Sequence, residues 1–191
     1  MKLLAVAFAV LSLSSGAAPA PAKRSPTPTR LEERPMDAVI HKSVRLACNA
    51  HQAFRMFTED NLLAAWLADS AEVEPKVGGK FHLIWAQTPD PNHGTQGCKI
   101  TVYEPDRLLA FQWRGPDRFD DSMNKADPLT HVTVSFHACE AAAGKSCTEV
   151  HLVHTGWGHG ADWDKAREFF EHAWTGAFGA LAEKISLVAP K

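Results

Sequence analysis

Short stretches in which apolar and polar residues alternate account for much of the chain after residue 39. In residues 40–46, the apolar side chains of Ile40, Val44 and Leu46 fall on one face, which predicts a half-buried β-strand. The same alternation, bounded by Gly, Pro or Asp, predicts six further strands, at residues 71–74, 80–85, 97–104, 108–113, 131–138 and 148–155. Because the connections are short, we expect neighbouring strands to form an antiparallel meander.

The end of the chain has a different period, with an apolar residue at every third or fourth position. From Asp162 onward this pattern predicts one long amphipathic helix, and Asp162 and Asp164 put negative charge where a helix N-terminus favours it. The apolar stripe consists of Trp163, Ala166, Phe170, Ala173, Trp174, Ala177, Phe178, Leu181, Ile185 and Val188. Seven strands and this helix together predict an α+β fold with an antiparallel meander and a long C-terminal helix.

Shorter elements connect the first two strands. Asn49 is a suitable N-cap for a helix carrying Ala53, Phe54 and Phe57, and a second short helix is predicted over residues 59–66. Residues 86–96 and 115–130 show no regular pattern and are long for hairpin connections. We therefore expect these two segments to be lids or binding loops, with disorder as the alternative.

The first 35 residues do not belong to the predicted fold. Residues 1–22 combine Lys2, an apolar run over residues 3–13 and then small residues, which is the pattern of a secretory signal peptide cleaved before Lys23. The apolar run is too short for a membrane anchor, which needs about 20 residues. Residues 23–35 contain three prolines and predict a flexible linker, so the folded domain is expected over residues 36–191 in an exported, periplasmic or secreted protein.

Composition and charge narrow the choice of partners. The 191 residues are 45% hydrophobic and 22% charged, which fits one globular domain with one core. A formal net charge of -2 offers no surplus of positive charge with which to neutralise a run of phosphates. Nucleic acid is therefore excluded as an expected partner, and no stable membrane anchor is expected either.

Export changes the interpretation of the four cysteines, because thiols can pair in an oxidising compartment. Cys139 and Cys147 flank a turn between two predicted strands, so we expect a disulfide between them. This leaves Cys48 to pair with Cys98. The alternative is that all four remain buried free thiols.

Four segments, taken in order, resemble one known superfamily. They are residues 73–81 (Val-Glu-Pro-Lys-Val-Gly-Gly-Lys-Phe), 103–113 (Tyr-Glu-Pro-Asp-Arg-Leu-Leu-Ala-Phe-Gln-Trp), 131–136 and 148–158. The chain from Ile40 to Leu187 is similar to the SRPBCC (START/Bet v 1-like) superfamily, and in particular to members related to the activator of the heat-shock-protein ATPase. The order of the segments carries the resemblance, since each segment alone is weak.

The resemblance implies a helix-grip fold, in which the long C-terminal helix lies in the concave face of the sheet and often leaves a cavity for lipids, polyketides or other apolar molecules. It implies no shared catalytic residues, so function does not follow from the fold. The signal peptide, the cysteines and the two long loops depart from the cytoplasmic members. They argue against a chaperone role, because ATP and the cytosolic partner are absent outside the cell membrane.

Aromatic and aliphatic side chains on the inner faces of the strands and the helix are the candidate ligand-binding residues. The predicted set is Phe81, Leu83, Trp85, Phe111, Trp113, His154, Trp174 and Phe178. Each of them could instead be packed core, and the prediction of a pocket rests on the whole set. The first hypothesis is therefore a domain that binds an apolar small molecule, and a protein-interaction module with a filled core is an alternative.

The ten histidines invite a metal hypothesis that their spacing does not support. His151 and His154 are three residues apart on a predicted strand and point to opposite faces, and no HExxH or Cys-x-x-Cys motif is present. There is also no P-loop and no dinucleotide glycine signature. We therefore predict neither a metal nor a cofactor.

His154 is the one candidate for acid-base chemistry, because it shares a strand face with apolar residues and would be buried beside a ligand. Asp117, Asp120 and Asp121, in the segment that could cover the pocket, are the nearest candidate carboxylates. This set would suit a cyclase or hydrolase acting on an apolar substrate. A structural hydrogen-bonding role for His154 is the favoured interpretation, and no catalytic residue is assigned.

Overall fold

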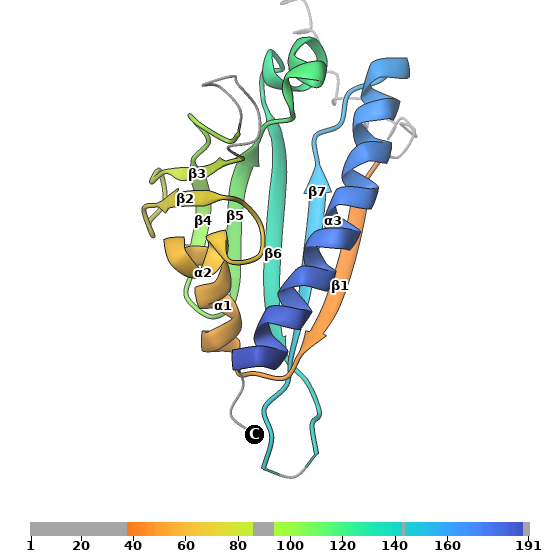
Figure 1. Ribbon diagram of the computed structural model, residues 1–191. Helices are drawn as coiled ribbons and strands as arrows, with labels where there is room; N and C mark the ends of the chain where they lie inside the picture. The colour runs from red at the N-terminus through yellow and green to blue at the C-terminus, as the bar shows by residue number, and fades with distance from the viewer. Residues whose placement is uncertain (1–37, 86–93, 143, 189–191) are drawn as a thin grey trace, which may run out of the picture. The chain divides into compact units, whose positions relative to one another are not determined.

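The computed structural model describes residues 38–85, 94–142 and 144–188. For residues 187 and 188 it describes the backbone alone. Its elements follow the predicted order, as Figure 1 shows. They are β1 (Ile40–Leu46), α1 (Ala50–Thr58), α2 (Asp60–Ala64), β2 (Ser70–Val73), β3 (Phe81–Ile84), β4 (Ile100–Glu104), β5 (Leu108–Trp113), the 3-10 helix η1 (Asp117–Phe119), the π-helix η2 (Asp120–Asn124), β6 (Thr130–Ala138), β7 (Thr148–Thr155) and α3 (Ala161–Val188). The α+β class is confirmed.

The seven predicted strands are present but divide into two antiparallel sheets, one of five strands in the order β1-β7-β6-β5-β4 and one formed by β2 and β3. Backbone hydrogen bonds join the sheets, from Phe81 N to Cys98 O at 3.0 Å and from Ile100 N to Gly79 O at 2.9 Å. The strand predicted to begin at residue 97 begins only at Ile100, because Lys99 before it forms only an isolated bridge, to Lys80. The small sheet therefore extends one edge of the large one.

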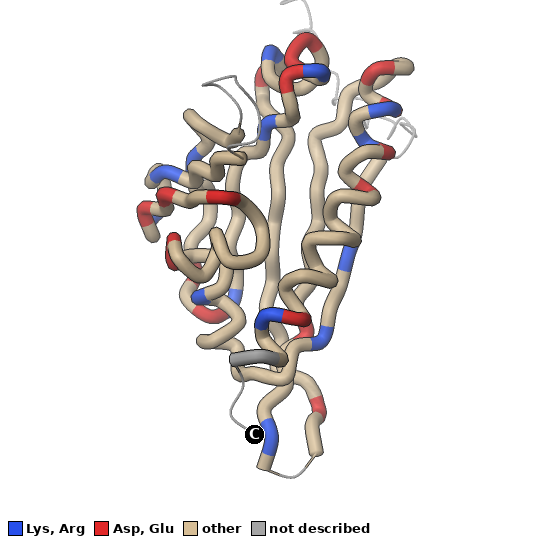
Figure 2. The backbone as a smooth tube through the Cα atoms, viewed as in Figure 1, with Lys and Arg blue, Asp and Glu red and all other residues tan. Residues whose placement is uncertain are grey.

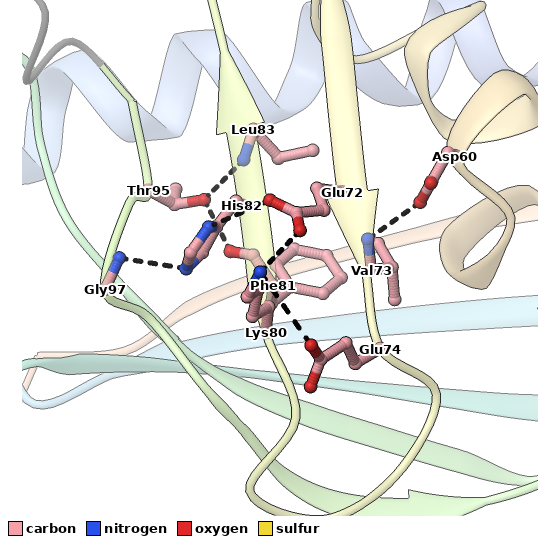
Figure 3. Close-up of polar contacts among 10 residues, drawn as sticks. All are labelled: Asp60, Glu72, Val73, Glu74, Lys80, Phe81, His82, Leu83, Thr95 and Gly97. Atoms are coloured by element: carbon pink, nitrogen blue, oxygen red, sulfur yellow. Dashed lines mark hydrogen bonds and ion pairs between the residues drawn. The ribbon is translucent and has the colours of Figure 1, made fainter.

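Side-chain contacts hold the β2-β3 hairpin against its neighbours (Figure 3). Thr95 Oγ1 accepts a hydrogen bond from Leu83 N at 2.8 Å and donates one to Phe81 O at 2.7 Å, although Thr95 is fully buried. Asp60 Oδ1, in α2, accepts a hydrogen bond from Val73 N at 2.7 Å. These contacts satisfy backbone groups that the short hairpin cannot satisfy by itself.

Helix α3 lies along one face of the five-stranded sheet (Figure 1). Its buried residues recur with the helical period, and they are Ala166, Phe170, Trp174, Phe178, Leu181 and Ile185. In β7, the residues facing this side are Thr148, Val150, Leu152 and His154, all fully buried, which follows from the two-residue period of a strand. Lys42 of β1 forms an ion pair with Glu171 of α3 at 2.5 Å. The core therefore lies between the sheet and α3.

The short helix α1 begins as predicted, with Asn49 as its cap. Asn49 Oδ1 accepts a hydrogen bond from Gln52 N at 2.9 Å, and Gln52 Oε1 accepts one from Asn49 N at 3.1 Å, which completes a capping box. The apolar face of α1 places Phe54 and Phe57 edge-on to Phe136 of β6, at ring distances of 5.3 and 5.4 Å. Helix α1 thus covers the part of β6 beside the end of α3.

Of the two predicted disulfides, the one between Cys139 and Cys147 is present and links β6 to β7 at the hairpin, with a Cα–Cα distance of 5.1 Å. The predicted bond between Cys48 and Cys98 is wrong, because both are buried free thiols. Cys48 follows the end of β1 and Cys98 precedes the start of β4, and these are the two outer strands of the five-stranded sheet. Because β1 and β4 run in the same direction, the two cysteines also lie at opposite ends of the sheet, beyond the roughly 7 Å that a disulfide can span.

Two long connections were predicted, residues 86–96 between β3 and β4 and residues 115–130 after β5. Within residues 115–130, which were predicted to be irregular, the structure forms η1 and η2. The reason is local: Asn124 donates from its Nδ2 to Gly115 O at 2.9 Å and accepts at its Oδ1 from Gly115 N at 2.7 Å, which closes the segment into a compact turn. Of the predicted loop 86–96, residues 86–93 lie outside the described residues, as do the predicted signal peptide and linker. None of the described helices has the length and apolar character that a bilayer crossing requires.

Candidate ligand-binding site

A cavity of about 730 Å³ lies between α3, the end of β5 and the segments that flank the small sheet. Helix α3 contributes one wall, between Phe169 and Ala180, and β5 with the following segment contributes another, between Trp113 and Arg118. Trp66, Leu67 and Asp69, after α2, and Trp85, after β3, complete the described lining together with Gly94. Cavities that bind small molecules have volumes of about 300–1,000 Å³, so this one is large enough for a ligand.

Four tryptophans from different parts of the chain, Trp66, Trp85, Trp113 and Trp174, line the cavity. Trp113 is central among them, with ring-centre distances of 4.9 Å to Trp174 and 6.3 Å to Trp85. Hydrogen bonds fix two of the outer rings, from Trp66 Nε1 to Met56 O at 2.8 Å and from Trp85 Nε1 to Leu67 O at 2.9 Å. The aromatic walls are therefore held rigidly, as a preorganised apolar site requires.

The helix wall of the cavity is made of small residues. Ala173, Gly176, Ala177 and Ala180 follow one another at helical spacing and all belong to the lining. A methyl group added at Gly176 would meet no other atom within 4 Å. The cavity exists because these positions of α3 carry side chains too small to fill it.

His154 lies next to this site, in a chain of hydrogen bonds between buried groups. Trp174 Nε1 donates to His154 Nδ1 at 3.2 Å, so the proton of the neutral ring is on Nε2, which lies 3.0 Å from Thr130 Oγ1. Thr130 Oγ1 in turn donates to Trp113 O at 3.0 Å. Both ring nitrogens are thus used to connect β7 with α3 and β6.

Burial lowers the pKa of His154 to about 3, and the charge of His131 acts in the same direction. The ring is therefore neutral at physiological pH and has no free nitrogen with which to exchange a proton. Among the candidate carboxylates, those of Asp120 and Asp121 pair with Lys125, at 3.6 and 2.5 Å. This geometry favours the structural interpretation of His154 over the enzymatic one.

Three of the eight predicted ligand-binding residues, Trp85, Trp113 and Trp174, line the cavity. The other five, Phe81, Leu83, Phe111, His154 and Phe178, are buried but are not part of its lining. Phe81 and Phe111 stack on each other with ring centres 3.7 Å apart, which closes the space between β3 and β5. These five residues pack the core beneath and beside the cavity.

Sequence reasoning missed Trp66, Phe169 and the two arginines of the lining, Arg114 and Arg118. Arg114 Nη1 donates to Gln96 O at 3.1 Å, and the guanidinium group of Arg118 lies over the rings of Phe119 and Phe169, at 4.9 and 4.3 Å. The sequence offered one signal for Arg114. It directly follows Trp113, an inward-facing tryptophan at the end of a strand. Arg118 offered no such signal, because its position depends on the fold of η1.

The histidines that the structure describes do not gather into a ligand set. His151 and His154 point to opposite faces of β7, where His151 Nδ1 lies 3.0 Å from His41 Nε2 on the outer face. Among the described residues, no group of three or more His, Cys, Asp or Glu side chains is placed to hold a metal ion.

Residues 47–185 match a family model described as Activator of Hsp90 ATPase homolog 1-like protein. No curated protein matches the chain. Among solved structures, a Mesorhizobium loti protein is 16% identical over 80% of this chain and 100% of its own, with a TM-score of 0.61. The Aha1 dimer of Colwellia psychrerythraea is 15% identical over 78% of this chain and 96% of its own, with a TM-score of 0.57. An HSP90 activator from Plasmodium falciparum is 20% identical over 77% of this chain and 94% of its own, with a TM-score of 0.56.

Proposed function

From the premise that the chain belongs to the family of Activator of Hsp90 ATPase homolog 1-like proteins, within the SRPBCC superfamily, we propose that it binds an apolar small molecule in the cavity beside α3. The observation that carries this proposal is a cavity of about 730 Å³ walled by four tryptophans. Concave sites of this volume, lined mainly by apolar and aromatic side chains with a few polar groups, are where proteins bind small molecules. Ala173 and Gly176 of the lining are exposed, so the site is open to solvent and a ligand can reach it.

The surrounding elements support a role in binding. Strand β6 has no Lys, Arg, Asp or Glu and β7 has one, Glu149, so these two strands carry little charge, as Figure 2 shows by the few coloured segments there. Hydrogen bonds fix the rings of Trp66, Trp85 and Trp174, so a ligand would enter a largely preformed site. Preformed apolar sites bind without the entropic cost of ordering their side chains.

We also propose that the protein acts outside the cytoplasm, in the periplasm or as a secreted protein. The signal-peptide pattern of residues 1–22 supports this location, and so does the Cys139–Cys147 disulfide, since such bonds persist in oxidising compartments. The name of the Plasmodium falciparum relative suggests contact with an Hsp90-type ATPase as a second function. That function requires a cytosolic location, so the two proposals make opposite predictions about where the protein is found.

Ligand binding can be tested by filling the cavity from the helix side. In the Ala177→Leu variant, the added side chain would occupy space that the wild-type chain leaves open. We expect wild-type protein to bind the neutral fluorescent probe phenylnaphthylamine and Ala177→Leu to bind it at least about 10-fold more weakly, because one displaced ring contact is worth about 1.4 kcal/mol or more. Fluorescence titration measures both affinities.

The matched control is Thr175→Leu, which adds an apolar side chain to an exposed position of the same helix, outside the cavity lining. We expect this variant to bind the probe as wild type does. A wild-type protein that binds no apolar probe, or an Ala177→Leu variant that binds as tightly as wild type, would contradict the proposed function.

A further inference from the structure

Two positively charged side chains line the cavity at its β5 end. Arg114 and Arg118 both belong to the lining, and neither forms an ion pair within the described residues. Arg114 uses one N–H for the carbonyl of Gln96, and a guanidinium group has five N–H donors. Arg118 is held by the faces of Phe119 and Phe169, a contact that leaves its N–H groups available. Both side chains can therefore donate hydrogen bonds to a ligand.

The indole N–H of Trp113 is a further hydrogen-bond donor at the cavity, and it has no partner within the described residues. Its nitrogen is buried and makes no hydrogen bond within the part of the chain that the structure describes, and the side chain is 3% exposed. The other three cavity tryptophans donate to Met56 O, Leu67 O and His154 Nδ1. Leaving a buried donor unpaired costs free energy, so an acceptor on a bound molecule would remove that cost at Trp113.

The charge of the lining limits the kind of acceptor. Among the described residues of the lining, Arg114 and Arg118 carry positive charge. Two guanidinium groups favour an anionic acceptor over a neutral one. Guanidinium groups pair with planar carboxylates through two parallel hydrogen bonds, which a singly charged carboxylic acid can accept. The remainder of the cavity is aromatic and requires an apolar body.

We propose that the ligand is an apolar carboxylic acid, with its carboxylate at Arg114 and Arg118 beside the Trp113 N–H and its apolar body among the tryptophans. This inference rests on the proposed function and names the class of ligand for the same cavity.

The test compares one skeleton as an acid and as its amide, at neutral pH. Pyrenebutyric acid and pyrenebutyramide have the same apolar body and differ in the charge of the head group. We expect wild-type protein to bind the acid about 10-fold more tightly than the amide, since charge-assisted hydrogen bonds are about twice as strong as neutral ones. Arg114→Gln and Arg118→Gln should each lower the affinity for the acid by about 10-fold and lower the affinity for the amide clearly less, because only the acid forms charge-assisted hydrogen bonds.

The matched control is Arg107→Gln, which removes the same charge from an exposed position that does not line the cavity. We expect it to bind both compounds as wild type does, and in the cavity variants a larger loss for the acid than for the amide shows that the cavity itself is kept. Equal binding of acid and amide, or an equal loss in Arg107→Gln and Arg114→Gln, overturns the inference and leaves the proposed function standing. If neither compound binds to wild type, the proposed function fails as well.

Discussion

His154 connects three elements through its ring, which gives this one residue a large share in holding α3 to the sheet. It accepts from Trp174 of α3, at 3.2 Å, and lies 3.0 Å from the hydroxyl of Thr130 in β6. Its own carbonyl accepts from Trp157 Nε1 at 3.0 Å, which fixes the segment before α3. Such a buried network stabilises only while all its members are paired.

We expect His154→Phe to lower the free energy of unfolding by about 1–3 kcal/mol, because the variant keeps the ring volume and leaves the Trp174 N–H buried without an acceptor. Urea unfolding followed by circular dichroism measures the change. His151→Phe, at the opposite face of the same strand, should change stability less, by about 0.5 kcal/mol. An equal effect of both substitutions would contradict a structural role for His154.

The low pKa of His154 also predicts how stability depends on pH. Its pKa in the folded protein is about 3, below the ordinary value of 6.5, so the unfolded chain binds the proton more strongly between these two values. The contribution of this residue to stability is complete above pH 6.5 and decreases as the pH falls toward 3, by up to about 1.4 kcal/mol for each pH unit. The His154→Phe variant should lose this part of the pH dependence, which unfolding curves at several pH values can measure. An identical pH dependence in the variant and wild type would contradict the assignment to His154.

At the scale of elements, the β6-β7 hairpin carries the disulfide that the spacing of Cys139 and Cys147 predicted. The bond closes a loop with a sequence separation of eight residues, far from the cavity side of the sheet. Cys48 and Cys98 remain thiols, and burial raises their pKa values to about 11 and about 12, so both are protonated and unreactive at neutral pH.

We expect the double substitution Cys139→Ser and Cys147→Ser to lower the free energy of unfolding by about 2–3 kcal/mol, because the loop of the unfolded chain is then no longer closed. Thiol titration gives an independent check. Without reductant, two thiols per chain should react after denaturation and none before it. Four reactive thiols in denatured protein would contradict the disulfide.

Sequence patterns located most elements because each pattern reflects a local property. The alternation of β5 and β7 and the helical period of α3 are set by which residues face the core, so their positions were predicted closely. The start of β4 was not, since the pattern of Cys98 and Lys99 is that of strand residues, but the structure pairs them only with Phe81 and Lys80 through isolated contacts. Residues 117–124 were also missed, because the side chain of Asn124 rather than a periodic pattern organises their two helical turns.

At the scale of the whole molecule, the location of the protein separates the proposed ligand-binding role from a role with a cytosolic ATPase. We expect expression in a bacterial host to yield protein in the periplasm or medium that begins at Lys23, because residues 1–22 have the order of charge, apolar run and small residues that signal peptidase recognises. Fractionation and the intact mass of the purified protein measure both properties. Protein that keeps Met1 and stays in the cytoplasm would contradict export.

The sequence alone determined the class of fold, the order of the strands and helices, the partner of Cys139 and the resemblance to the SRPBCC superfamily, because these depend on local periodicity, short spacings and the order of motifs. Only the tertiary structure decided which inward-facing residues border open space. Trp113 and Phe111 have the same alternation in β5, yet Trp113 lines the cavity while Phe111 stacks on Phe81. It also decided that Arg114 and Arg118 reach that space and that Cys48 and Cys98 lie at opposite ends of the sheet. The two-residue period of a strand shows which of its side chains face the core. What fills the space above that face depends on elements distant in the sequence.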